Sequence, residues 1–121
     1  MGFLDRFKPA APPTPDDLSN QAVLVYLDGQ NLSDQVYETC DLVTLEDLLI
    51  PVLEASGAGE YDGDESASGE TCLYFYGPDA DRLFAAIQPI LRSYPLCSGA
   101  RVVLRFGQPG ATQRELQLPV V

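Results

Sequence analysis

Short apolar segments of strand length, separated by turn residues, constrain the fold of this chain more than any other feature. Residues 22–28 (AVLVYLD), 70–76 (ETCLYFY) and 100–106 (ARVVLRF) are rich in β-branched and aromatic residues. In the second segment, apolar side chains on alternate positions belong to opposite faces of a strand. The sequence therefore predicts a β-sheet with at least three confident strands.

Two segments between these strands have the apolar spacing and the end signals of helices. Residues 44–56 begin with a capping hydroxyl followed by acidic residues, and Gly57 is expected to close that helix. Residues 79–93 begin with acidic residues and carry apolar residues at helical spacing. Each segment contains an internal proline, Pro51 or Pro89, that is expected to kink the helix.

The order of these segments predicts a fold class. An acidic segment at 59–65 is a further strand candidate, and residues 114–118 form a possible last strand. The resulting order βαββαβ, with a possible extra C-terminal strand, is that of an α+β, ferredoxin-like split βαβ sandwich. In this arrangement the acidic strand 59–65 lies at one edge and the strand 100–106, with two arginines, lies at the other. A different α+β arrangement stays open.

The chain divides into a tail and one domain. Residues 1–19 include PAAPPTPDD, whose prolines favour an extended linker, so they are expected to form a flexible N-terminal tail and Pro-rich linker. Residues 20–121 are expected to form a single α+β domain. The N-terminal residues lack the pattern of a secretory signal, and no apolar run reaches the length of a membrane span. The expected location is the cytoplasm.

Charge is distributed unevenly along the chain. The net charge is −11, and all but two of the eighteen acidic residues lie within residues 9–81, a stretch without lysine or arginine. Such a surface repels phosphate backbones, so nucleic acid is not expected as a partner. A protein partner with a basic surface would be attracted instead. Solubility alone would also account for the acidity.

The residue inventory argues against several classes of enzyme. The sequence has no histidine, which excludes His-containing triads and His metal ligands. Its one lysine, Lys8, lies in the expected tail, and its three cysteines form no CxxC pair. No phosphate-binding or nucleophile motif is present. We therefore expect a non-enzymatic protein without a cofactor.

The cluster of acidic residues at the predicted hairpin is the first candidate site. Asp62 and Asp64 are weak candidates for metal ligands, although the spacing that follows them fails the EF-hand template. Regular strand alternation would place Glu60, Asp62 and Asp64 on one face and Glu65 on the other. A solvated edge or a partner-binding patch formed by these four acids is favoured over a metal site.

The tyrosines of the predicted central strands are the second candidate site. If Tyr74 and Tyr76, with Tyr26, are exposed, they would form a homodimer or protein-binding face. If they face the helices, they belong to the core. We expect the core placement.

One part of the chain resembles a known group of proteins. Residues 57–91 contain GEYDGDE and LYFYGPDAD, and VVLRFGQPG follows at 102–110. These runs resemble a family of small bacterial proteins that share a GE[FY]DG[DN]E hairpin and an LYxYGPDAD helix entry. The resemblance implies a bacterial source. No activity is attached to that family, so the resemblance supplies no site residues.

Three functional hypotheses follow from these features. The first is a non-enzymatic binding or regulatory domain that acts through protein–protein contacts, with a homodimer as one possibility. The second is an acidic inhibitor or immunity-type protein that masks a basic effector by charge complementarity. The third is a small enzyme dependent on a divalent metal at Asp62 and Asp64.

Overall fold

A computed structural model describes residues 21–120 of the chain, so the expected tail and linker lie outside the described residues. The described part contains, in order, β1 (Gln21–Asp28), α2 (Asp34–Thr39), α3 (Leu42–Ser56), β2 (Glu60–Ala67), β3 (Glu70–Gly77), α4 (Ala80–Ser93), the 3₁₀ helix η1 (Pro95–Cys97), β4 (Arg101–Arg105) and β5 (Gln113–Gln117). Within this part no helix is long and apolar enough to cross a membrane.

The five strands form one antiparallel sheet in the order β2-β3-β1-β4-β5, which confirms the α+β class. β1 is the central strand and pairs with β3 on one side and β4 on the other. The acidic strand β2 lies at an edge, as expected. The expectation that the arginine-bearing strand β4 forms the other edge is wrong, because β5 pairs along its whole length.

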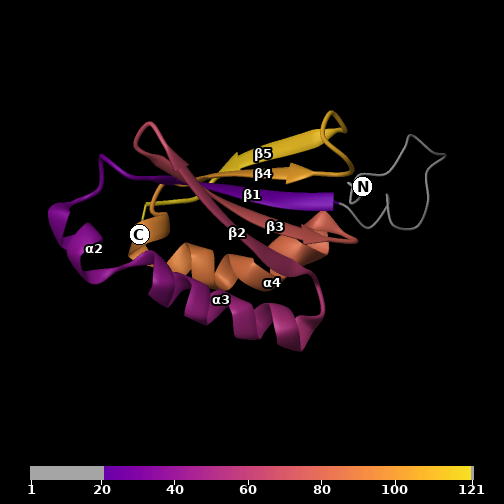
Figure 1. Ribbon diagram of the computed structural model, residues 1–121, viewed down its shortest axis with the longest axis horizontal. Helices are drawn as coiled ribbons and strands as arrows, with labels where there is room; N and C mark the ends of the chain where they lie inside the picture. Colours follow the sequence, from indigo (N-terminus) through magenta and orange to yellow (C-terminus); the bar gives the residue numbers. More distant parts are fainter. Residues whose placement is uncertain (1–20, 121) are drawn as a thin grey trace, which may run out of the picture.

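The hydrophobic core lies between the sheet and the two long helices. Figure 1 shows α3 and α4 on the same side of the sheet. Strands contribute Val23, Val25 and Phe75, and the helices contribute Leu49 and Ile87; each of these side chains is fully buried. This layer is where most of the apolar surface leaves water, so it dominates the stability of the fold.

The ends of α3 follow capping rules, with one correction. α3 begins at Leu42, and the side chain of Asp41 accepts a hydrogen bond of 2.7 Å from the backbone N–H of Thr44. Asp41 therefore caps the helix in place of the predicted Thr44, so the N-cap lies three residues earlier than expected. The C-terminus is as predicted, because Gly57 adopts a left-handed conformation with φ of 65°.

The short helix α2 was not predicted, because residues 30–43 are polar and show no clear period. Ser33 caps it by accepting a hydrogen bond from the N–H of Val36. The Tyr37 hydroxyl donates to the carbonyl of Asp28 at 2.9 Å and accepts from the N–H of Leu32 at 3.0 Å. These contacts, which the local sequence pattern does not indicate, hold α2 against the end of β1.

The β2–β3 hairpin has a tight turn and one irregularity. Ser68 and Gly69 have φ of 53° and 77°, the left-handed conformations of a two-residue hairpin turn. A β-bulge shifts the register between Tyr61 and Gly63, which places an extra residue, Asp62, in β2. This bulge changes which acidic side chains share a face, as described below.

Candidate functional site: the open face of the sheet

The side of the sheet opposite α3 and α4 carries a second set of side chains. We call it the open face, because no helix among the described residues lies on it (Figure 1). Strand alternation and the pairing register assign to it Ala22, Leu24, Tyr26, Glu60, Glu65, Glu70, Cys72, Tyr74, Tyr76, Arg101, Val103, Arg105 and Glu115.

The centre of the open face is apolar. Ala22, Leu24, Cys72 and Val103 form a buried cluster that is separate from the main core. Three half-buried tyrosines, Tyr26, Tyr74 and Tyr76, pack against this cluster. The expectation that these tyrosines face the helices is therefore wrong. Leu73 and Phe75 occupy the helix side of β3, while a tyrosine on the open face keeps its hydroxyl close to water or a polar partner.

Charge is divided across the open face, with β1 as the dividing line. Acidic side chains lie on β2 and β3, where Glu60 pairs with Tyr76 and Glu65 pairs with Cys72. Basic side chains lie on β4, where Arg105 pairs with Ala22 and Arg101 with Tyr26. Glu115 of β5 lies beside these arginines. The open face therefore combines an apolar, aromatic centre with an acidic flank and a flank of net positive charge, which we call the basic flank.

Tyr74 connects the centre to the acidic flank. Its hydroxyl donates a hydrogen bond of 2.9 Å to Oε1 of Glu65. This bond to a carboxylate stabilises the protonated hydroxyl and raises the pKa of Tyr74 well above its usual range. The bond fixes the ring of Tyr74 against the acidic flank.

Breaking this bond is expected to change the alkaline titration of the protein. With Glu65→Gln, tyrosinate should appear at lower pH than in the wild type, because the neutral amide no longer favours the protonated hydroxyl. Since the folded pKa is raised, the contribution of the bond to stability is present below the unfolded pKa of about 10 and is lost as pH rises through the folded pKa. Ultraviolet absorbance of tyrosinate, followed against pH, measures the effect.

The matched control for this titration is Glu60→Gln, which removes a carboxylate from the same strand and the same face but leaves the Tyr74–Glu65 bond in place. Its curve should overlie that of the wild type. Coincident curves for wild type and Glu65→Gln would contradict the assigned bond.

Arg101 organises the basic flank. Its guanidinium carbon lies 4.0 Å from the centroid of the Tyr26 ring, which is the geometry of a cation–π contact. The same side chain lies 3.8 Å from a carboxylate oxygen of Glu70 and 3.8 Å from one of Glu115. These ion pairs are long and solvent-exposed, so they contribute little stability. Arg101 therefore keeps donors available for a partner.

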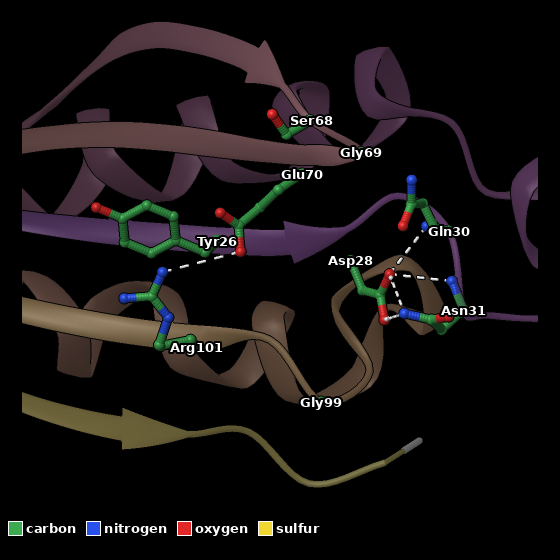
Figure 2. A pocket seen from close by; sticks show the side chains of 9 residues that line it. All are labelled: Tyr26, Asp28, Gln30, Asn31, Ser68, Gly69, Glu70, Gly99 and Arg101. Carbon is green, nitrogen blue, oxygen red and sulfur yellow. Dashed lines mark hydrogen bonds and ion pairs between the residues drawn. The ribbon is translucent and has the colours of Figure 1, made fainter.

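A polar hollow of about 350 Å³ lies at one end of the open face. Figure 2 shows Tyr26, Glu70 and Arg101 on one side of it and Asp28, Gln30 and Asn31 on the other. The Asp28 carboxylate accepts hydrogen bonds from the backbone N–H groups of Gln30 and Asn31, at 2.9 and 3.0 Å, and from the Asn31 amide. These bonds lower the pKa of Asp28. Its carboxylate holds the loop after β1 in place.

Cys72 in β3 and Cys97 in η1 lack the features of nucleophiles. Burial raises the pKa of the Cys97 thiol to about 12. Burial also raises the pKa of Cys72, which lies at the centre of the open face. A reactive thiol needs a lowered pKa, so the arrangement favours packing over chemistry at both positions.

The bulge in β2 separates the acidic residues that regular alternation placed together. Glu60 and Glu65 lie on the open face, whereas Asp64 pairs with Leu73 on the side of Tyr61 and the helices. The expectation that Glu60, Asp62 and Asp64 share one face, with Glu65 opposite, is therefore wrong. Within residues 21–120 no group of three or more His, Cys, Asp or Glu side chains is placed to hold a metal ion.

A second exposed apolar surface lies on the outer side of α3. Val43, Leu48 and Ile50 are 64%, 45% and 39% exposed, and the acids Asp47 and Glu54 lie among them. This surface lacks aromatic and arginine side chains, the types enriched in protein interfaces. It provides an internal comparison for the open face.

Comparison of the chain with protein-family models, with curated protein sequences and with solved structures gave no match. The site is therefore built from its own geometry. Sequence reasoning singled out Tyr74, Tyr76, Glu60 and Glu65, which the structure places on one face. The sequence did not predict that Arg101 and Arg105 lie on the same face as these residues, because the pairing of β4 with β1 depends on contacts between residues distant in sequence.

Proposed function

We propose that this protein is a non-enzymatic binding or regulatory domain that contacts a protein partner through the open face. The observation that carries the proposal is the cluster of Tyr26, Tyr74 and Tyr76 around a buried apolar centre on the side of the sheet without helices. Tyrosine and arginine are enriched where proteins bind one another, and they dominate the energetics of such interfaces.

Charge supports a protein partner over other ligands. The acidic residues Glu60, Glu65 and Glu70 flank the aromatic centre on one side, and Arg101 and Arg105 flank it on the other. A partner with complementary charges would be oriented by both flanks. A phosphate backbone would be repelled by the acidic flank and by a net charge of −11.

We also propose the finer description of the fold and setting. The order β2-β3-β1-β4, with α3 and α4 on one side, supports an elaborated ferredoxin-like split βαβ sandwich, to which β5 and α2 are additions. A bacterial source, which rests on the sequence resemblance, and a cytoplasmic location are parts of the same proposal.

The test is a capture experiment with three immobilised full-length proteins. Wild type is compared with an open-face variant, Tyr74→Ala/Tyr76→Ala, and with a control, Leu48→Ala/Ile50→Ala, that removes apolar side chains from α3. Each is incubated with lysate of the source cells and, separately, with the purified chain itself. We expect wild type and the control to retain the same protein and the open-face variant to lose it by at least about tenfold, the effect of one interface hot spot.

Three outcomes would overturn the proposal. Equal retention by all three proteins, or none by any, would show that the open face is not a binding surface. Loss only in the Leu48→Ala/Ile50→Ala variant would move the binding surface to α3. Melting temperatures of the three proteins, compared beforehand, separate loss of binding from loss of folding.

A further inference from the structure

We propose that the open face binds a second copy of this chain, with a two-fold axis that runs parallel to β1. This inference rests on the proposed function, because it assigns the partner of the same face. It begins from the sheet order, in which β1 is central and has two strands on each side. Rotation about an axis over β1 therefore lays β3 of one copy over β4 of the other and β2 over β5.

The charge pattern selects this axis over the alternative. With the axis parallel to β1, the acidic flank of each copy covers the basic flank of the other. Glu60 and Glu65 of β2 then lie over β5 of the second copy, offset sideways by one strand spacing, about 4.8 Å, from the rows of Arg105 and Arg101 on β4, with the two sheets about 10 Å apart. A two-fold axis perpendicular to the strands would place the acidic flank of one copy over the acidic flank of the other. That arrangement costs energy through like-charge repulsion.

The same axis also determines how the centre of the face packs. Because β1 lies on the axis, its open-face residues Ala22, Leu24 and Tyr26 each meet their own equivalents in the second copy. Tyr76 lies over Arg105 of the second copy, and Tyr74 lies over its Val103, because these residues are in matching rows on either side of β1. Aromatic side chains thus meet a cation and an apolar side chain.

The size of the face sets the expected strength of the dimer. The strands are five to eight residues long, so the face measures roughly 20 Å by 20 Å. Burial of this face on both copies removes on the order of 1,000 Å² of surface, the lower limit for a specific interface. A dimer that dissociates at micromolar concentrations is therefore expected.

The test uses two charge-reversed variants of the full chain. The first, Glu60→Arg/Glu65→Arg, makes both flanks basic, and the second, Arg101→Glu/Arg105→Glu, makes both flanks acidic. Sedimentation equilibrium from about 1 to 500 μM, a range that brackets a weak interface of this size, gives the mass. We expect wild type to dimerise, each variant alone to remain monomeric, and an equimolar mixture to form a heterodimer.

A milder variant gives a second reading that does not depend on charge reversal. Glu60→Gln/Glu65→Gln removes the acidic flank and keeps the size of both side chains, which are exposed. With the axis parallel to β1, this variant should dimerise more weakly than wild type because it loses attraction. Tighter association would show that acidic flanks face each other, and would overturn the proposed axis.

The inference and the proposed function fail in different ways. A wild type that stays monomeric over the whole range, or a mixture that does not associate, overturns the homodimer. The proposed function would still stand if the Tyr74→Ala/Tyr76→Ala variant lost a different captured protein that the Leu48→Ala/Ile50→Ala control retained.

Discussion

Replacing Phe75 with alanine is expected to lower the free energy of unfolding by about 3–5 kcal/mol. Phe75 is fully buried between the sheet and the helices, and its ring centroid lies 5.2 Å from that of Tyr61. The loss combines the transfer of an aromatic ring to water with a cavity that the sheet and two helices cannot close. Because domains of this size are stable by only about 5–15 kcal/mol, much of the margin would disappear. Urea unfolding measures the change.

The matched control is the neighbouring residue on β3. Tyr76→Ala removes a ring of similar size from the open face, where the side chain is half-buried. The free energy of unfolding should fall by less than about 2 kcal/mol, because truncating the half-buried ring of Tyr76 removes less buried surface than truncating Phe75. A larger loss for Tyr76→Ala than for Phe75→Ala would show that the main core lies on the open face. Comparison of the denaturant slopes checks that both variants unfold from the same folded state.

Gly77→Ala is the second substitution with a large expected effect, about 3 kcal/mol of lost stability. A Cβ at this position would lie 2.3 Å from the carbonyl oxygen of Ala58 and 3.1 Å from Cα of Gly59. Both are backbone atoms of the segment that leads into β2, so no side-chain rotation can relieve the contact. The strand end and this segment would have to separate. Thermal unfolding followed by circular dichroism reports the loss.

Gly57→Ala separates this steric effect from the conformational freedom of glycine. Gly57 has φ of 65°, and a Cβ there meets nothing within 4 Å. Its substitution should therefore cost only the left-handed backbone energy, about 1–2 kcal/mol. If the Gly57 variant were the less stable of the two, close approach of the strand end to the Ala58 segment could not be the main constraint at Gly77.

Local patterns in the sequence predicted most of the elements but not their environment. The alternation in 70–76 separated Leu73 and Phe75 from the tyrosines correctly. Alternation alone does not say which set faces the helices, and this is decided by how α3 and α4 pack. The start of α3 was misplaced because Asp41 and Thr44 both have side chains that can cap a helix, and the chain uses the earlier one.

The candidate site was predicted only in part, because one of its determinants has a single local signal and another is not local. The bulge at Asp62 reverses the alternation of β2. Gly63, which has φ of 114°, is the sequence signal for this bulge, because an isolated glycine inside a strand often marks one; the expectation of regular alternation did not take it into account. The basic flank depends on the pairing of β4 with β1, whose residues are separated by about eighty positions in the chain. β5 was expected as a possible strand, but its place beyond β4 follows from tertiary pairing.

The central position of β1 has a consequence for how the protein is made. β1 is synthesised first among the strands of residues 21–120, yet both of its neighbours in the sheet, β3 and β4, are synthesised much later. Until then its apolar residues 22–27 have no strand to pair with, whereas β2 and β3 can form their hairpin as soon as both exist. Since unpaired apolar strands associate readily, the nascent chain depends on the later synthesis of β3 and β4, or on a chaperone, to protect β1.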